Sequence, residues 1–508
     1  MAFTSCDLEE MPTTSIGLDN NEEAVVNGTN IQNFENGLYS AFRATQYGVF
    51  SEVPELICDG FNETKGSGNV LGPVHRTDAS FTSSDQDVQS IWSGYYGYIV
   101  DYNNFIHDLY VEEQEAEFEE LLQGDENANP DAYAIRGLGA AHFFRAYTYM
   151  QLARLFAKDY EPSTAATDLC VPLVLEYNQE EKPARATVQQ VYDQIKADLD
   201  AAALYLSAVG MVGQPRSEYV TVDAVNAVYA RYYLDTHDYP AAAEYAVSVI
   251  GSNAGYALAN TPDSMTYEYT YDQGTEAIFQ MAASLAENGS GTNSDYTNWA
   301  AAPDGYEAYF PEGYYASPYY LPSYKLMSLY EDSDIRFDQW FNMGHGLLVE
   351  SYIVGPAAGV PVPLFTKYAG NPDLTNSFPN GRQHVKPLMI GEMYLILAEA
   401  SLQANDPTTA AQALNELQTK RGATPTAATM ENIQNEWFKE TVGEGLRFSC
   451  LKRWHIGYNG REAYIPDLVA GGTNGTEKVM PADDDHWLLP IPAYERQLND
   501  NLVQNPGY

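Results

Sequence analysis

Aromatic side chains gather between residues 295 and 330, in a segment rich in Gly, Pro, Asn and Ser. Nine tyrosines lie there together with Trp299 and Phe310. A flat ring can stack on an apolar face, and Tyr and Trp each carry one polar group at the rim. The surrounding turn residues favour exposed loops over a regular core face. The segment therefore indicates a binding surface, although the same rings could instead fill a core between this segment and the rest of the chain.

Neutral sugars match such a surface, because their rings have apolar faces and a rim of hydroxyl groups. Trp299 is the strongest candidate, since it closes the polar run Asn-Ser-Asp-Tyr-Thr-Asn at residues 293–298. The further aromatic residues that we expect to contact a glycan are Tyr296, Tyr306, Tyr314 and Tyr315.

A second candidate is the loop from Asp59 to Phe81, which lies between two predicted helices. Its glycines are interspersed with polar residues able to bind hydroxyl groups, among which we single out Asn69, His75 and Arg76. A purely structural loop is the alternative.

Catalytic chemistry has little support in the sequence. The chain has no G-x-S-x-G, H-E-x-x-H, phosphate-binding loop or nicotinamide fingerprint. The eight histidines are dispersed without ligand spacing, so no metal site is predicted from them. Two carboxylates would suffice for a glycoside hydrolase, which keeps that activity as a minor alternative. We predict a protein that is not an enzyme and needs no cofactor.

Two acidic clusters could bind a structural Ca²⁺ ion through carboxylate oxygens. Neither follows the EF-hand pattern, so solvated or helix-capping carboxylates are the favoured interpretation. The clusters are Asp332, Asp334 and Asp338, and Asp483, Asp484 and Asp485.

Charge and cysteine content exclude several classes of protein. The formal net charge of −44 repels phosphate backbones, which argues against nucleic acid as a partner. Four cysteines in 508 residues do not make a disulfide framework. No apolar run is long enough to predict a membrane-spanning helix.

Helical periodicity dominates the segments on either side of the aromatic-rich region. Apolar residues fall three or four apart from Thr187 to Leu206, and Thr187 with Gln190 predicts a capping box. The segment 133–157 is apolar on most sides, as expected of a helix inside a bundle, with Arg136, Arg145 and Arg154 at intervals of nine.

Helices are also predicted in pairs, over 223–234 with 240–250 and over 391–402 with 407–421. Small residues line the second helix of each pair, as in Ala242 and Ala246 or Ala410 and Ala413, and allow close packing. This resembles tetratricopeptide-type packing. Between residues 251 and 386 the helical signal fades, and we expect loops, short helices and a little β structure, such as a strand near 347–354. Long loops of this kind are usually functional.

The N-terminus reads Phe3-Thr4-Ser5-Cys6. This is similar to the end of a bacterial lipoprotein signal, in which small residues precede a cysteine that receives lipid. The interpretation makes Cys6 the lipidation site and residues 1–23 a signal remnant and tether. An incidental cysteine near a mobile end is the alternative.

Several motifs in order resemble the SusD/RagB family of outer-membrane nutrient-binding lipoproteins of Bacteroidetes. They are the F-x-R-A-x-x-Y helix at 143–149, Val171-Pro172-Leu173-Val174, the E-x-Y-L…A-E-A helix at 392–400, Glu440 with Glu444-Gly445 and Arg447, Leu451-Lys452-Arg453-Trp454, Leu489-Pro490-Ile491-Pro492 and the C-terminal Gln504-Asn505-Pro506-Gly507-Tyr508.

The resemblance implies a mainly α unit over 24–508, with about eight helices in tetratricopeptide-like pairs. It places Trp92, which begins the helix after the loop 59–81, in the scaffold, so we expect a core residue there. The scaffold would comprise 24–250 and 387–460, the loop-rich ligand-binding insertion 251–386, and a C-terminal extension 461–508. It also implies a glycan-binding lipoprotein on the outer membrane at the cell surface, anchored there by lipid. The expected partner is a SusC-like TonB-dependent barrel that receives an oligosaccharide. A peptide ligand is the alternative within the same family.

Overall fold

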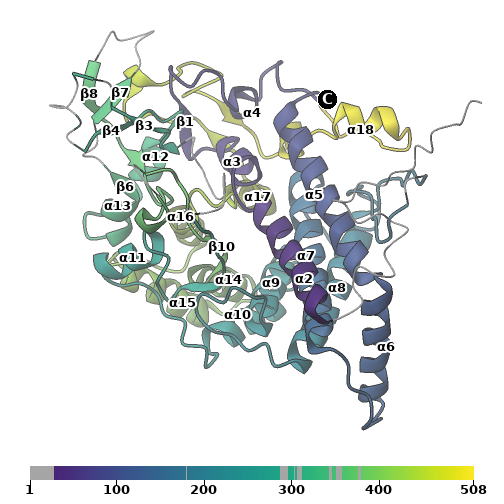
Figure 1. Cartoon of the computed structure of the whole chain (residues 1–508). Helices are drawn as coiled ribbons and strands as arrows, with labels where there is room; N and C mark the ends of the chain where they lie inside the picture. The colour runs from purple at the N-terminus through teal and green to yellow at the C-terminus, as the bar shows by residue number, and fades with distance from the viewer. Residues whose placement is uncertain are drawn as a thin grey trace, which may run out of the picture.

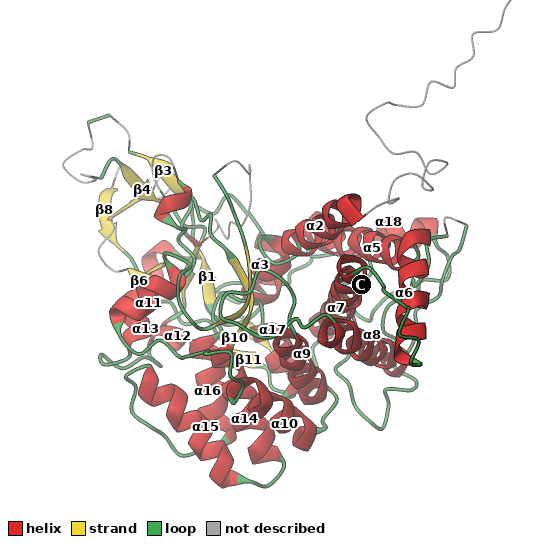
Figure 2. Cartoon of the chain, turned by 60° about the horizontal axis from the view of Figure 1, so that its bottom comes forward, coloured by secondary structure: helices red, strands yellow, loops and turns green. Residues whose placement is uncertain are grey.

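The computed structural model describes residues 28–178, 180–285, 296–302, 304–305, 310, 312–342, 346–349, 357–375 and 379–508. Helices are the main secondary structure, and strands β3 (Trp299–Ala301), β4 (Tyr314–Ala316) and β8 (Ala357–Pro361) lie at one end of the molecule, while β10 (Val385–Met389) lies near its middle (Figure 1, Figure 2). The predicted mainly α class is confirmed. Among the described residues, no helix combines the length and hydrophobicity that crossing a membrane requires. Cys6 lies outside the described residues.

Paired helices build the scaffold. Its helices are α5 (Gln86–Ile106), α6 (Leu109–Leu122), α7 (Ala132–Phe156), α8 (Val188–Ala208), α9 (Val222–Asp235), α10 (Tyr239–Ile250), α14 (Ile390–Gln403) and α15 (Pro407–Lys420). Helices α7 and α8, α9 and α10, and α14 and α15 pack as pairs, and α10 also packs on α14. Ala242, Ala246, Ala410 and Ala413 are buried where these helices meet. The small residues thus permit the close approach that the sequence predicts.

The helix boundaries follow the capping residues. Thr187 accepts from the Gln190 backbone N–H at 3.2 Å, while the Gln190 side chain accepts from the Thr187 N–H at 2.9 Å. The predicted capping box is therefore present at the start of α8. Asp406 caps α15, and Pro407 occupies its first turn, where a missing N–H costs nothing.

Helix α7 is the centre of the N-terminal half, and 20 of its residues are buried. An interval of nine residues turns a helix by half a circle, so consecutive arginines point to opposite sides. Arg136 pairs with Glu35 at 2.6 Å, Arg145 with Asp198 at 2.7 Å and Arg154 with Asp235 at 2.8 Å. The three arginines thus fasten α2 (Gly28–Ala44), α8 and α9 around one helix.

The insertion contains α11 (Pro262–Tyr269), α12 (Tyr324–Met327) and α13 (Ile335–Trp340), with β2 (Ala277–Met281), β6 (Phe341–Asn342) and β9 (Leu364–Phe365). One four-stranded sheet has the order β3-β4-β7-β8, from β3 (Trp299–Ala301), β4 (Tyr314–Ala316), β7 (Gly346–Val349) and β8 (Ala357–Pro361). Residues 347–349 of the predicted strand are confirmed, whereas 350–354 lie outside the described residues. Strand β2 pairs with β10 (Val385–Met389), and Phe279 packs on Phe42. The insertion therefore starts in the core and reaches the surface at its sheet.

The remaining elements belong to the N-terminal and C-terminal parts of the chain, except β5 (Tyr320–Pro322), which lies in the insertion. They are α3 (Val49–Leu56), β1 (Phe61–Glu63), α4 (Gly72–Arg76), β5, α16 (Met430–Glu440), α17 (Arg447–Arg453), β11 (Tyr458–Asn459), β12 (Val479–Met480) and α18 (Ala493–Leu498). Helix α17 packs on α3, and Trp92 is buried as expected. Cys58, Cys170 and Cys450 are buried free thiols, as the absence of disulfide spacing suggests.

Candidate functional site

The loop from Asp59 to Phe81 and the insertion meet through β1 and β5. These strands pair antiparallel, with Phe61 opposite Pro322 and Glu63 opposite Tyr320. The pairing continues into Thr64, whose N–H donates to the Tyr319 carbonyl at 2.8 Å. The Thr64 hydroxyl donates to the Pro318 carbonyl at 3.1 Å. Two segments that the sequence singles out separately thus form one surface.

A cleft of about 250 Å³ lies where the two segments join. Its floor includes Leu321 and Leu468, which belong to a small apolar cluster with Val362 and Val469. The residues lining the cleft are Thr64, Gly66, Asn298, Ala300, Tyr315, Ser317, Pro318, Tyr319, Leu321 and Leu468. Small-molecule sites usually measure roughly 300–1,000 Å³, so this cleft suits part of an extended ligand.

The register of β3 and β4 decides which aromatic rings face the cleft. Ala300 lies opposite Tyr315, while Trp299 lies opposite Ala316 and Ala301 opposite Tyr314. Cross-strand partners share a face of a sheet, and neighbours along a strand alternate. Ala300 and Tyr315 therefore face the cleft together, and Trp299 and Tyr314 point to the opposite face. The rings of Trp299 and Tyr314 contact edge to face, with centroids 5.4 Å apart.

The predicted aromatic residues therefore do not all belong to one site. Tyr315 lines the cleft, and its ring lies 5.7 Å from that of Phe310, centroid to centroid. Tyr296 is buried with 1% of its surface exposed and packs between Phe61 and Phe365. This ring fills the core, as the alternative interpretation of the aromatic segment held. The prediction that Tyr296 contacts a glycan is therefore wrong for this structure. Tyr306 lies outside the described residues.

The predicted polar residues of the loop also divide. Arg76 donates to Glu63 at 2.7 Å, to Asp78 at 2.9 Å and to the Asn69 side-chain oxygen at 2.6 Å. Asn69 is exposed and Arg76 is partly exposed, so a ligand could still reach them. His75 is fully buried. In this conformation His75 cannot contact a ligand, so it is not a residue of the binding site.

His75 instead anchors the loop from below. Its Nε2 accepts from the Glu63 backbone N–H at 3.4 Å, its Nδ1 lies 2.6 Å from the Leu56 carbonyl, and its ring packs on Tyr320. Burial lowers the pKa of the His75 ring, and the neighbouring Arg461 adds to that effect. A neutral ring with both nitrogens engaged holds the shape of the loop and has no free capacity for binding.

Sequence reasoning missed four polar or aromatic residues of the cleft: Thr64, Asn298, Ser317 and Tyr319. The Asn298 amide nitrogen donates to the Ser317 carbonyl at 3.0 Å. Within the described residues the Asn298 side-chain oxygen and the Tyr319 hydroxyl make no hydrogen bond, so both can serve a ligand. Asn298 adopts a positive φ of 42° just before β3. Asn is a typical turn residue, and this residue type is the signal that the sequence offered for Asn298.

The acidic clusters act as helix caps and ion pairs. Asp334 caps α13 and pairs with Arg336 at 2.7 Å and with Lys439 at 3.3 Å. Asp484 accepts from the His486 backbone N–H at 2.9 Å. Both central carboxylates are thus engaged, in agreement with the capping interpretation.

Two family models match the chain in non-overlapping segments. The model described as the SusD family matches residues 364–508, and the one described as starch-binding and associating with the outer membrane matches residues 20–234. Together the matches cover well over half of the chain, and the span between them contains α10 and most of the insertion. The chain belongs to the SusD/RagB family.

Members of this family are similar to the chain over almost its whole length. SusD-like protein P2 of Formosa agariphila is 24% identical, with 99% of this chain and 96% of the relative covered. A SusD superfamily structure from Bacteroides thetaiotaomicron matches with a TM-score of 0.73 at 22% identity, covering 94% of this chain and 99% of that one. The surface glycan-binding protein A of Bacteroides fluxus matches with a TM-score of 0.67 at 20% identity, covering 95% and 100%. These structures establish the SusD-like fold.

The SusD/RagB motif residues hold the scaffold together. Glu392 pairs with Arg231 at 2.6 Å, and Glu399 binds both Arg453 at 2.9 Å and the Trp454 indole at 2.8 Å. Motifs in such positions explain why the family is recognisable while its ligand is not.

Proposed function

We propose that this chain captures a neutral oligosaccharide in the cleft between its loop 59–81 and its insertion. The observation that carries the proposal is the chemistry of the cleft. None of the described residues that line it is charged, although the chain has a net charge of −44. Tyr315 and Tyr319 offer rings, and Asn298, Thr64 and Ser317 offer groups that bind hydroxyls.

An uncharged cleft of this kind matches a sugar and does not match a phosphate or a charged peptide. A charged ligand would have to give up its hydration without a partner of opposite sign, which is unfavourable. The family description as starch-binding supports the same ligand class. Wider depressions lie over α15 and beside Tyr267. Scaffold residues alone line the first, and the charged residues Glu268, Glu416 and Lys420 contribute to the lining of the second.

The family supports a proposal for the cellular role. We infer a non-catalytic lipoprotein, anchored to the outer membrane through Cys6, which presents the cleft at the cell surface. It delivers the bound oligosaccharide to a SusC-like TonB-dependent barrel. The family description as associating with the outer membrane supports this location.

Calorimetric titration against a panel of neutral and acidic glycans and of peptides tests the proposal. We expect binding to at least one neutral glycan without release of shorter products. Binding to peptides alone would favour peptide capture, and product release would favour a glycoside hydrolase. Either result would overturn the proposal. Co-purification with a barrel protein from native membranes tests the partner.

A further inference from the structure

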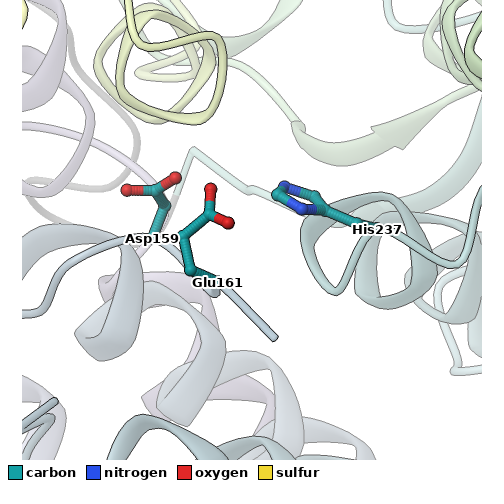
Figure 3. Close-up of side chains that lie close together, drawn as sticks. All are labelled: Asp159, Glu161 and His237. Carbon is teal, nitrogen blue, oxygen red and sulfur yellow. The ribbon is translucent and has the colours of Figure 1, made fainter. Parts of the chain in front are cut away.

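Four side chains able to ligate a metal meet at the junction of three connections. Asp159 and Glu161 follow the end of α7, His237 lies in the turn between α9 and α10, and His455 follows α17. One carboxylate oxygen of Asp159, one of Glu161 and a ring nitrogen of His237 lie within 4.8 Å of one another. In Figure 3 the Glu161 carboxylate lies between the Asp159 side chain and the His237 ring.

His455 lies beside the two carboxylates of this group. Its Nε2 lies 2.9 Å from Glu161 Oε1 and 3.3 Å from Asp159 Oδ2. These distances resemble the roughly 3.3 Å that separates two ligand atoms in a tetrahedral site with bonds of about 2.0–2.1 Å. The side chain of His455 is 57% exposed, which gives the group access to solvent.

Two atoms of the group lack the partners expected at their depth. His237 Nε2 and Asp159 Oδ2 are both buried, and neither makes a hydrogen bond within the described part of the chain. The contact of Asp159 Oδ2 with His455 is an ion pair at 3.3 Å. Such atoms are rare in folded proteins and call for an explanation. A metal ion between the carboxylates and the two rings would bind both atoms.

We propose that Asp159, Glu161, His237 and His455 form a Zn²⁺ site. Two imidazoles with two carboxylates make a donor set that suits zinc. Ca²⁺ and Mg²⁺ prefer oxygen ligands alone and do not match two ring nitrogens. Zinc would take the place of the proton that His455 shares with Glu161.

The site would strengthen a junction that already exists. Lys452 of α17 donates to the Ala157 carbonyl at 2.7 Å and to the Arg154 carbonyl. The segment after α7 is thereby held against α17, so His455 and Asp159 approach without a large movement. Zinc would join residues of the two separately matched halves, and its role is therefore to stabilise the scaffold.

The experiment uses the full chain without a histidine tag, treated with EDTA and dialysed. Titration with ZnCl₂ should show one ion per chain, and CoCl₂ should give the visible absorption of tetrahedral Co²⁺. Unfolding should shift to a higher temperature with zinc. His237→Ala should weaken zinc binding at least tenfold, and the shape-conserving Glu161→Gln should do the same if His237→Ala fails to fold.

The matched control is His107→Ala, which removes an exposed histidine 3.4 Å from Glu112 and away from the group. It should bind zinc as the unmodified chain does. Equal zinc binding by the unmodified chain, His237→Ala and Glu161→Gln would overturn the proposal, as would a preference for CaCl₂ over ZnCl₂.

Discussion

Arg447 donates to Asp59 through both Nε and Nη2, at 2.9 and 3.1 Å, although the two residues are 388 positions apart. Lys325 of the insertion donates to the same carboxylate at 2.7 Å. Asp59 thus joins the start of the binding loop to the insertion and to α17. Burial alone would raise the pKa of Asp59, but the two cations more than offset it and hold the pKa well below its usual range.

Replacing Asp59 should therefore destabilise the protein strongly. Asp59→Ala leaves the guanidinium of Arg447 buried without its counter-charge, which typically costs about 3–5 kcal/mol. Urea unfolding followed by circular dichroism measures the effect. Lys196→Met is the matched control, because it removes an exposed ion pair to Asp200 and should change stability by less than about 0.5 kcal/mol. Similar losses for both variants would contradict the anchoring role.

Glu55 should make stability depend on pH. Burial raises the pKa of Glu55 from 4.5 to about 7, although the backbone N–H groups of Gly443 and Gly445 donate hydrogen bonds to it. Between about pH 4.5 and 7 the folded chain keeps a proton that the unfolded chain has lost. The contribution of Glu55 to stability is thus full below pH 4.5 and falls as the pH rises to 7.

Glu55→Gln keeps the shape of the side chain and removes the titration. The stability of Glu55→Gln relative to the unmodified chain should rise between pH 5 and 8, by on the order of 2–3 kcal/mol. Comparing the two proteins cancels His75 and His384, whose lowered pKa values act in the opposite direction. A stability difference that is constant over this pH range would refute the assignment.

The two faces of β3 and β4 should differ in ligand binding. Tyr315→Ala removes a ring from the cleft and should weaken glycan binding roughly tenfold or more, which is about 1.4 kcal/mol. Trp299→Ala alters the opposite face and should have a smaller effect. Calorimetry measures both, with Tyr494→Ala on α18 as the exposed-tyrosine control. A large loss for Trp299→Ala alone would place the ligand on the other face.

The capping box of α8 should contribute a modest amount. Thr187→Ala removes the side-chain oxygen that accepts from the Gln190 N–H, and it should cost about 1 kcal/mol in urea unfolding. Thr187→Ser retains that oxygen and should restore most of the loss. Equal stability of the alanine and serine variants would show that the cap is dispensable.

The scaffold was predictable because its information is local. Helix α8 spans Val188–Ala208 where periodicity and capping predict 187–206. The three arginines of α7 are visible in the sequence, but their partners on α2, α8 and α9 are not. Periodicity shows which face of a helix is buried and does not show what covers that face.

The binding surface was predictable only as a pair of segments. Strands β3 and β4 have three residues each, too few for the alternation that would assign Tyr315 and Trp299 to opposite faces. The sequence predicted His75 as a binding residue because it does not show which distant residues pack against the ring. One of them is Arg461, which lies 386 positions away. The metal-ligating group likewise joins residues 159, 161, 237 and 455, which no local spacing reveals.

A crystal structure of the full chain with the tightest-binding glycan would show directly whether the glycan binds in the cleft between the loop 59–81 and the insertion. We expect a sugar ring in the cleft between residues 64–66 and β4, stacked on Tyr315 or Tyr319, with a hydroxyl bound by Asn298. A glycan bound elsewhere, with this cleft empty, would contradict the proposal.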